Sequence, residues 1–292
     1  MKNIVIFGDT GFIGNALVAR LLQQENYKIF GISRIAKEDV ENYEHFPCNV
    51  LTSSDVFQAI LWIKESKRFI DAVIYLCGLT KHEDIVGKKS LMYRLHTEGV
   101  LNAVKFAKEV GAKNFVYVSS GKAAEGNFGT LHSAKIMAEE CATVFPNAII
   151  ARPFNVYGRG QNPNYLIPYV VRSALTAGKV ELETISTIRD FVHVDDVAHA
   201  LQILADITAD DLVIADIGSG KSVSVGDVVA TIAKLLNKEV SIVCNKPKRI
   251  GEINREYASN SKSKLLIDNG YSPRNLEKGI IDVINEYKEK CK

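Results

Sequence analysis

The sequence of 292 residues predicts an α/β protein, in which a doubly wound parallel sheet precedes a smaller, mixed α/β lobe. Up to Pro153, short apolar runs alternate with longer segments of helical period, which is typical of buried parallel strands joined by crossover helices. After Pro153 the rhythm changes, and residues 154–168 are rich in Gly, Pro and Asn. We therefore expect one domain over residues 1–153, a lobe mainly over 154–292, and a return of the chain to the first domain near 188–217.

The first part of the chain predicts strands and helices in strict alternation. The apolar runs are short enough for strands buried on both faces, and the segments between them have the length of amphipathic helices. The helix expected at 99–111 ends at Gly111, and glycine is a typical residue at a helix C-terminus. We expect strands at 3–7, 27–33, 71–76, 114–120 and 147–153, and helices at 13–24, 55–66, 99–111 and 131–145.

The second part predicts a less regular lobe. Residues 154–168 are expected to form a long functional loop. Beyond it we expect helices at 169–177, 196–205 and 225–237, and strands near 188–194 and at 212–217. Asp195 is expected to open the second of these helices. The tail predicts two helices separated by a Gly-Tyr-Ser-Pro turn.

Composition excludes several classes of function. Apolar residues make up 47%, charged residues 24%, and the formal charge is +2, so no basic surface indicates nucleic acid or a membrane partner. Five cysteines without a CxxC pair predict neither a disulfide framework nor a metal site. The N-terminus lacks the apolar run of a signal peptide, and no segment is long enough to span a membrane, so we expect a cytoplasmic location.

A glycine-rich turn directly follows the first strand. Gly8 suits the tight turn, Gly11 lets the backbone approach a pyrophosphate, and Gly14 lets helix and strand pack closely. The free N–H groups at the helix N-terminus favour the same anion. The spacing predicts a Rossmann-type dinucleotide-binding domain, with Thr10, Phe12 and Ile13 also at the cofactor.

The end of the second strand bears on which dinucleotide is bound. NAD enzymes usually have a carboxylate there for the ribose hydroxyls, whereas this chain has Ser33 and Arg34. A hydroxyl and a guanidinium suit a ribose 2′-phosphate. We expect NADP as the preferred cofactor; the alternative is NAD, with Arg34 as an ordinary surface residue.

Several segments together resemble the extended short-chain dehydrogenase/reductase family, mainly nucleotide-sugar epimerases, dehydratases and reductases. They are the GxxGxxG spacing, DAVIYLCG, FVYVSSGKAAEG, ARPFNVYGRGQ, RDFVHVDDVAHAL and KRIGE. The resemblance implies further cofactor contacts from Asn49, Val50, Leu76, Cys77, Gly78, Ser119, Lys135 and Pro153. It also implies that Asn155, Arg189 and Arg249 bind a nucleotide sugar, the arginines through its diphosphate.

The resemblance fails at two of three catalytic positions. The family uses a Tyr, a Lys four residues later on the same helix face, and a Ser or Thr. Lys135 is present, but the tyrosine position holds Leu131 and the Ser/Thr position falls on Gly121. We expect Lys135 and the neighbouring Ser120 to be catalytic.

Other residues are alternatives for the missing acid or base. His132 should point away from the face that bears Lys135, because one helical residue rotates the side chain by about 100°, and Cys77 suits a small buried residue better. His82, Lys122 and Glu125 lie on loops near the expected cleft, and the sequence does not choose among them. Lys135 itself becomes a base if burial lowers its pKa.

Three functions are open, and we expect the first of them. The first is a nucleotide-sugar enzyme acting by hydride transfer with a non-standard acid/base. The second is an inactive NADP(H) or nucleotide-sugar binding or regulatory protein. The third is a partner subunit of an active homologue. The helices at 99–111 and 131–145 are expected to form a dimer interface, which the resemblance implies.

Overall fold

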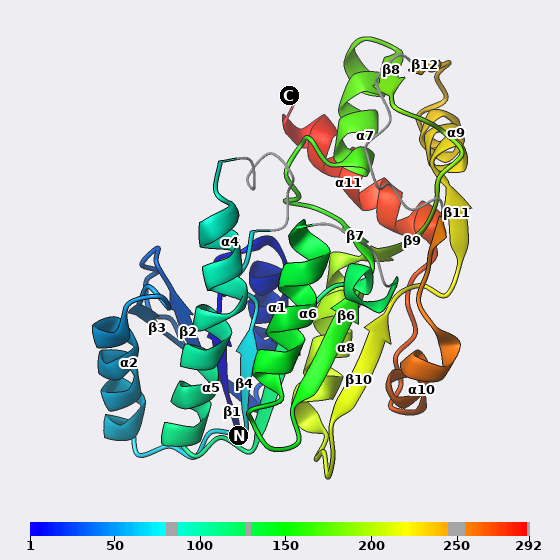
Figure 1. Ribbon diagram of the computed structural model, residues 1–292. Coiled ribbons are helices and arrows are strands. Elements are labelled where there is room, and N and C mark those ends of the chain that lie inside the picture. Colours follow the sequence, from blue (N-terminus) through cyan, green and yellow to red (C-terminus); the bar gives the residue numbers. More distant parts are fainter. Residues whose placement is uncertain (80–86, 126–129, 245–254, 291–292) are drawn as a thin grey trace.

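The computed structural model describes residues 1–79, 87–125, 130–244 and 255–290, which form a sheet-based lobe and a smaller lobe above it (Figure 1). Seven parallel strands make the sheet, in the order β10-β6-β5-β4-β1-β2-β3. Their bounds are β1 (Lys2–Phe7), β2 (Tyr27–Ser33), β3 (Tyr43–Pro47), β4 (Ala72–Tyr75), β5 (Asn114–Val118), β6 (Ile149–Pro153) and β10 (Val213–Ile217). The predicted fold class is therefore confirmed.

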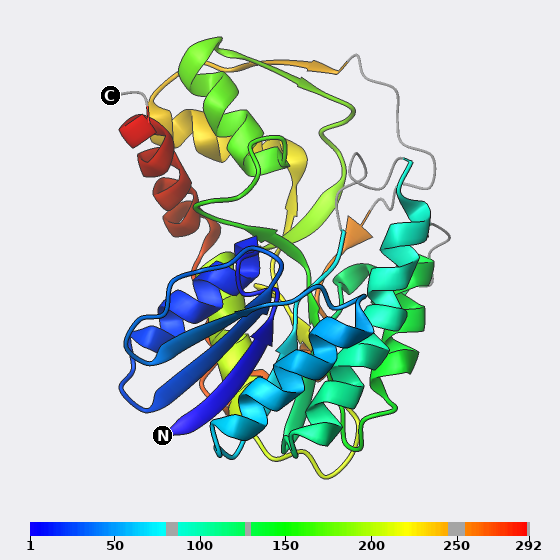
Figure 2. The same cartoon turned by 90° about the vertical axis from the view of Figure 1, so that its left-hand side faces the viewer.

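Helices cover both faces of this sheet (Figures 1 and 2). On one face α1 (Phe12–Leu22) packs against α8 (Val194–Asp206). The other face carries α2 (Ser53–Glu65), α5 (Glu98–Glu109) and α6 (Thr130–Ala142). Successive residues of β1 alternate between the two cores, Ile4 and Ile6 facing α1 and α8, and Val5 and Phe7 facing the other helices. Each such side chain contributes roughly 1.5–3 kcal/mol by its burial.

Two elements of this lobe were not predicted. β3 lies at the edge of the sheet, where it pairs with β2, and its sequence YEHFP lacks a continuous apolar run. The helix α4 (Lys89–His96) is short and packs on α5 and α6. The polar composition of both segments hid them from a search for apolar periodicity.

The smaller lobe is built on short strands. β9 (Ile188–His193) pairs with β7 (Asn155–Tyr157), β11 (Ser222–Ser224) and β13 (Arg255–Glu256), while β8 (Lys179–Leu182) pairs with β12 (Ser241–Cys244). Three helices form its core, α7 (Leu166–Thr176), α9 (Val225–Leu236) and α11 (Leu276–Lys290). The expected loop at 154–168 is shorter than predicted, because β7 and the first turn of α7 occupy its ends.

The chain returns to the sheet between the two halves of this lobe. α8 packs on α1, β10 extends the sheet beside β6, and α10 (Asn260–Asp268) lies against β10. The division of the chain at Pro153 remains a prediction. In the described ranges no helix is long and apolar enough to cross a membrane.

Candidate active site

The glycine-rich turn has the geometry that a dinucleotide needs. Gly8 has φ +86°, and a Cβ on Gly14 would collide with the Gly8 carbonyl oxygen. α1 begins at Phe12 after Gly11, and no side chain caps its first N–H groups. These groups and the open backbone fit a pyrophosphate. Thr10 lies in the turn and Ile13 packs towards the core. Their contact with the cofactor stays a prediction.

The adenosine end of the expected site lies at the carboxyl ends of β2 and β3. Arg34 is exposed and forms no ion pair within the described residues, whereas Ser33 is buried. The Asn49 side-chain oxygen accepts from Leu51 N at 3.2 Å and shapes the turn before α2. Val50 is buried, and its carbonyl accepts from Asn102 Nδ2 at 2.8 Å.

The segment after β4 packs closely on both the glycine-rich turn and α4. A Cβ on Gly8 would lie 3.2 Å from Cys77 Sγ, and one on Gly78 would lie 2.6 Å from His96 Cε1. Leu76 continues the strand, with its N–H donating to Phe7 O at 2.9 Å. Burial raises the pKa of the Cys77 thiol to about 12, which makes it a poor nucleophile at neutral pH.

Lys135 projects from α6 into the interior and is only 3% exposed. Its Nζ donates to Val118 O at 3.0 Å and lies 5.2 Å from the centre of the Tyr117 ring. Burial lowers the pKa of Lys135 to about 7, and the negative charge of Glu139 opposes this shift. An amine with such a pKa is able to accept and to release a proton near neutrality.

A buried ion pair lies one helical turn beyond Lys135. Glu139 accepts from Arg152 Nε at 2.9 Å and from Arg152 Nη2 at 2.6 Å. It also accepts from Ser119 Oγ at 2.5 Å, so the Ser119 hydroxyl proton is already engaged. The sequence reading missed this pair, although the four-residue spacing from Lys135 places Glu139 on the same helix face.

Phe154 occupies the space beside the position where the family has its Ser or Thr. A Cβ on Gly121 would lie 2.7 Å from Phe154 Cδ1. The preceding Ser120 caps the short 3₁₀ turn η1 (Gly121–Glu125), since its Oγ accepts from Lys122 N at 3.3 Å. The catalytic role expected of Ser120 stays a prediction.

The tyrosine position is embedded in an apolar cluster. Leu131 packs with Met92 and Ala134, and Leu79 and Tyr93 complete the group. The Leu131 side chain has no proton donor or acceptor. This position is therefore able to exclude water but not to transfer a proton.

His96 is a buried polar residue that the sequence reading missed. Its Nδ1 lies 3.4 Å from Tyr117 Oη, and its Nε2 lies 3.5 Å from Leu79 O. Burial, together with the charge of Lys135, lowers the pKa of His96 to about 3. The imidazole is therefore neutral at pH 7. Its helix α4 was not predicted, which explains why no signal pointed to it.

The remaining acid/base candidates differ in their surroundings. His132 is buried and donates from Nδ1 to Lys122 O at 2.7 Å, which ties α6 to η1. The Lys122 side chain is exposed. His82 and the Glu125 side chain lie outside the described residues. Among the described residues, no group of three or more metal-ligating side chains is arranged to hold a metal ion.

The expected substrate residues lie on the small sheet around β9. Asn155 Nδ2 donates to Asp190 O at 3.3 Å. Arg189 Nε lies 3.7 Å from Glu256 Oε2, and both side chains are largely buried. β13, which carries Glu256, packs beside η1, so these residues lie close to the Gly121 position. Arg249 lies outside the described residues.

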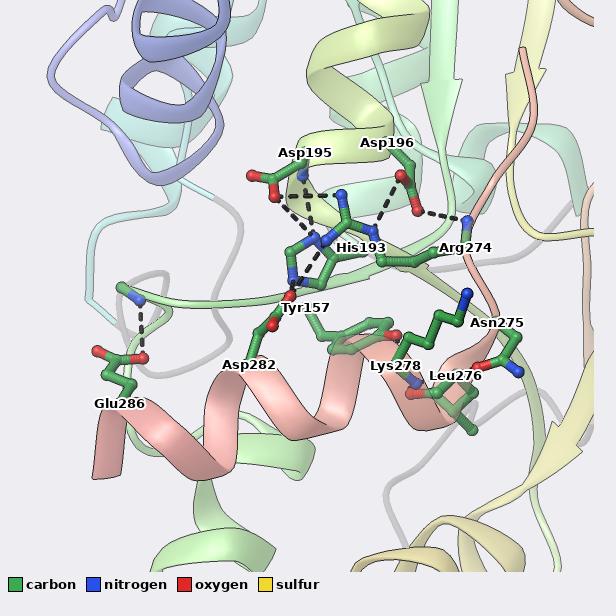
Figure 3. A network of polar contacts seen from close by, with 11 residues as sticks. Tyr157, His193, Asp195, Asp196, Arg274, Asn275, Leu276, Lys278, Asp282 and Glu286 are labelled. Carbon is green, nitrogen blue, oxygen red and sulfur yellow. Dashed lines mark hydrogen bonds and ion pairs between the residues drawn. The ribbon is translucent and has the colours of Figure 1, made fainter. Parts of the chain in front are cut away.

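An ion-pair network joins the two lobes (Figure 3). Arg274 binds Asp195 at 3.2 Å, and Asp196 and Asp282 at 3.1 Å each. His193, rather than the expected Asp195, caps α8, because its Nδ1 accepts from Asp195 N at 3.2 Å. Burial, reinforced by the charge of Arg274, lowers the pKa of His193.

A cavity of about 270 Å³ separates this network from the N-terminal end of α1. Phe12 and Asn15 line it from α1, and Arg159, His193 and Asp282 line it from the smaller lobe. The cavity borders the helix end that follows the glycine-rich turn, whereas Lys135, Asn155 and Arg189 are not among its lining residues.

Proteins of known activity are similar to this chain. UDP-glucose 4-epimerase 2 from Arabidopsis thaliana is 26% identical over an alignment that covers 90% of this chain and 89% of the relative. GDP-6-deoxy-D-talose 4-dehydrogenase from Aggregatibacter actinomycetemcomitans is 25% identical over 215 residues, covering 66% of each. UDP-glucuronic acid 4-epimerase from Bacillus cereus, solved with UDP-glucuronic acid and NAD, has a TM-score of 0.84 at 19% identity, with 99% of both chains covered.

The structural likeness confirms the fold, and the match to a family model shows the family to which the chain belongs. The model described as the NAD dependent epimerase/dehydratase family matches residues 4–215, most of the chain. The expectation of a cofactor-dependent enzyme of the nucleotide-sugar type is thereby confirmed at the level of the family. The chain belongs to the NAD dependent epimerase/dehydratase family.

Proposed function

We propose that this protein modifies a nucleotide sugar by hydride transfer at a sugar carbon, as an epimerase, dehydratase or 4-keto reductase, with Lys135 as its acid/base. The observation that carries the proposal is the buried Lys135 amine, whose pKa of about 7 matches the requirement for proton transfer. When bound, the dinucleotide supplies the hydride acceptor or donor. Lys135 then takes the proton from the sugar hydroxyl, or returns it.

Neighbouring groups support this role for Lys135. The Val118 carbonyl orients the amine, and Glu139 lies behind it on the same helix. His96 has a pKa of about 3, so it serves as a neutral hydrogen-bonding group and not as the base. Leu131 excludes water from the same region, which strengthens electrostatic interactions there.

Two arguments support NADP as the preferred cofactor. No carboxylate stands directly after β2, and Arg34 is exposed with its guanidinium unengaged by the described residues. Arg34→Ala should lower the affinity for NADP about tenfold and leave that for NAD unchanged. An unchanged NADP/NAD ratio contradicts this assignment.

Asn155 and Arg189 are proposed to hold the sugar nucleotide. Both come from the paired strands β7 and β9, and β13 beside them packs near η1. A guanidinium suits a diphosphate, and Arg249 would add a second. Arg189→Lys should raise KM more than it lowers kcat, because the lysine keeps the charge but loses the bidentate geometry.

The central experiment is turnover of UDP-, GDP-, dTDP- and CDP-sugars, followed by NMR and mass spectrometry. Under the proposal one sugar is altered, and kcat changes with pH through about 7. It rises with pH where Lys135 takes the proton from the sugar, and it falls where Lys135 returns one. Lys135→Met should lower turnover by about 10²–10⁴-fold. Lys28→Met, which removes another buried lysine, is the matched control and should retain activity. Full activity in Lys135→Met disproves the role.

A second function has its own support. The apolar cluster at Leu131 and the Phe154 ring beside Gly121 suit a binding or regulatory protein without turnover. This alternative predicts that cofactor and nucleotide sugar both bind, while every sugar is recovered unchanged. It also predicts that no deuterium passes from sugar carbon to cofactor.

We further propose a homodimer through α5 and α6. These helices pack together and expose the apolar side chains of Leu101, Ile136 and Met137, and Val144 is exposed in the turn after α6. Met137→Glu should convert a dimer to a monomer in light scattering. Co-purification with a different family member would favour a partner-subunit role.

The four cysteines of the described residues are free thiols, which suits the proposed cytoplasmic location.

A further inference from the structure

The arginine proposed to hold the diphosphate is paired with a carboxylate of the chain itself. Arg189 Nε lies 3.7 Å from Glu256 Oε2, and the two side chains are 12% and 3% exposed. Glu256 is the register partner of Arg189 where β13 pairs with β9. Because register partners on neighbouring strands lie on the same face of a sheet, the strand pairing itself keeps this carboxylate beside the guanidinium.

The position of Glu256 is fixed by the residues that follow it. Ala258 N donates to Asp190 Oδ2 at 3.3 Å, and Ser259 N donates to Asp216 Oδ2 at 3.0 Å. These bonds anchor the chain directly after β13 to β9 and to β10. Glu256 is itself only 2% exposed, so its carboxylate has little freedom to turn towards water. A ligand therefore meets a guanidinium whose counter-charge is already present.

This pairing leaves the Glu256 carboxylate incompletely satisfied. Its Oε2 is buried and accepts no hydrogen bond within the described ranges, since 3.7 Å is longer than a hydrogen bond. Arg189 donates from Nη1 to Ile188 O at 2.9 Å instead. A buried charge costs free energy unless its partners compensate it fully. The pair is thus an electrostatic contact that a better anion is able to replace.

The neighbouring carboxylate on β9 is engaged elsewhere. Asp190 follows Arg189 in the strand and therefore lies on the opposite face. It accepts from Ser219 N at 2.7 Å and from Ser219 Oγ at 2.6 Å. η1, which packs beside β13, carries Lys122, whose side chain is exposed. Asp190 therefore does not compete for Arg189, and the pair of Arg189 and Glu256 carries no net charge.

A diphosphate and the Glu256 carboxylate are competitors for the same guanidinium. Both are anions whose oxygen atoms pair with the N–H groups of an arginine. A diphosphate that contacts Arg189 comes close to the Glu256 carboxylate, and like charges repel strongly where little water separates them. Binding of the diphosphate therefore either displaces Glu256 or is weakened by it.

We propose that Glu256 is an internal competitor of the nucleotide diphosphate at Arg189, and that it sets how strongly the site discriminates between ligands of different phosphate charge. The inference rests on the proposed diphosphate role of Arg189 and adds a specificity-determining residue to it. The carboxylate lowers the affinity for a diphosphate and has little effect on an uncharged nucleoside. A ligand then depends on contacts to its base and its sugar, so a bare diphosphate is not retained.

The test follows affinity as a function of ligand charge. UDP, GDP, dTDP and CDP are titrated by calorimetry into wild type with saturating NADP or NAD, and the tightest is compared with its monophosphate and its nucleoside. Glu256→Gln keeps the shape and removes the charge. It should bind the diphosphate about tenfold more tightly, the monophosphate about threefold more tightly and the nucleoside within about twofold of wild type. Glu256→Asp keeps the charge on a shorter side chain and should fall between wild type and Glu256→Gln.

Glu109→Gln is the matched control, since it removes an exposed carboxylate of α5 that pairs with Lys64 of α2. It should leave all these affinities unchanged, and thermal melting checks that each variant is folded. An equal gain for diphosphate and nucleoside in Glu256→Gln overturns the inference, because the effect then comes from the fold and not from charge. Weaker binding of the diphosphate by Glu256→Gln overturns it as well.

Arg189→Gln separates this inference from the proposed function. If Arg189→Gln binds the diphosphate as tightly as wild type, the diphosphate role of Arg189 is itself wrong. If Arg189→Gln weakens the diphosphate about tenfold or more, while Glu256→Gln fails to strengthen it, the assignment of Glu256 alone is wrong.

Discussion

The glycine-rich turn and the first turns of α6 lie at the same edge of the sheet, yet they match the pattern that the family resemblance implies to very different degrees. The turn keeps Gly8, Gly11 and Gly14 in the geometry that a pyrophosphate needs. Of the catalytic set that the resemblance implies, α6 has Lys135 but has Leu131 at the tyrosine position, and the Ser/Thr position falls on Gly121 in η1.

The kind of contact explains this difference. A glycine-rich turn binds a pyrophosphate through backbone N–H groups, which every non-proline residue provides. Such a turn therefore requires only that side chains be absent where the backbone makes close contacts. Proton transfer depends on one particular side chain at one position, and a single substitution removes it. Family membership therefore predicts cofactor binding more securely than it predicts the acid/base.

The largest effect is expected when a side chain is added to the glycine-rich turn. In Gly14→Ala the new Cβ collides with the Gly8 carbonyl and lies 2.8 Å from Asp9 Cα, backbone atoms that are not free to move. We expect a loss of dinucleotide binding and a destabilisation above about 3 kcal/mol, measured by titration and thermal melting. Gly226→Ala in α9, where the Cβ finds an ordinary contact at 3.5 Å, is the control. Normal NADP binding by Gly14→Ala contradicts the account of the turn.

The next effect concerns the buried ion pair in α6. Glu139→Gln leaves the Arg152 guanidinium buried without its counter-charge and should cost roughly 3–5 kcal/mol in urea unfolding. Glu109→Gln breaks the exposed pair with Lys64 and should cost less than about 0.5 kcal/mol. Equal losses in the two variants would show that α6 does not depend on this pair.

A third effect appears in the pH dependence of stability. Lys135 has a folded pKa of about 7 against an ordinary value of 10.5, so between these pH values the unfolded chain binds one proton more. The free energy of unfolding therefore falls by about 1.4 kcal/mol per pH unit as pH drops from about 10 to 7. The difference between wild type and Lys135→Met isolates this contribution, because other groups cancel. A difference that stays constant from pH 7 to 10 argues against a lowered pKa.

A smaller effect is expected where the catalytic Ser or Thr is missing. Gly121→Ser places a Cβ 2.7 Å from the Phe154 ring and should destabilise the fold by about 1–3 kcal/mol. Phe154→Leu in the same chain should recover most of that loss, and a double-mutant cycle measures the coupling. Additive effects of the two substitutions would mean that Phe154 does not fill this space.

The smallest effect separates Ser33 from its neighbours. Ser33→Ala removes a hydroxyl that already bonds to His45 and Ile35, so NADP affinity should change by less than about twofold. Fluorescence titration with NADPH is sufficient. A tenfold loss would assign the phosphate contact to Ser33.

Local signals made most of the sheet predictable. The glycine-rich turn, the apolar strands and Lys135 all follow from short stretches of sequence or from their spacing. The edge strand β3 and the short helix α4 lack apolar periodicity, so His45 and His96 were missed with them. The lowered pKa of Lys135 arises from segments distant in sequence that bury it, and no local pattern contains that information. Glu139 is the exception, because its four-residue spacing from Lys135 was readable in advance.

The network around Arg274 has a consequence for how the chain is made. Asp195 and Asp196 leave the ribosome about 80 residues before Arg274, their shared cation. Because domains generally fold from the N-terminus during synthesis, the sheet forms while these carboxylates at the start of α8 still repel one another. Arg274, which lies just before α11, then offsets part of this charge, while Asp282 of α11 adds a third carboxylate to the network that joins the lobes. In nascent chains that end before residue 274, added salt should accordingly stabilise the start of α8, because it screens the repulsion between Asp195 and Asp196.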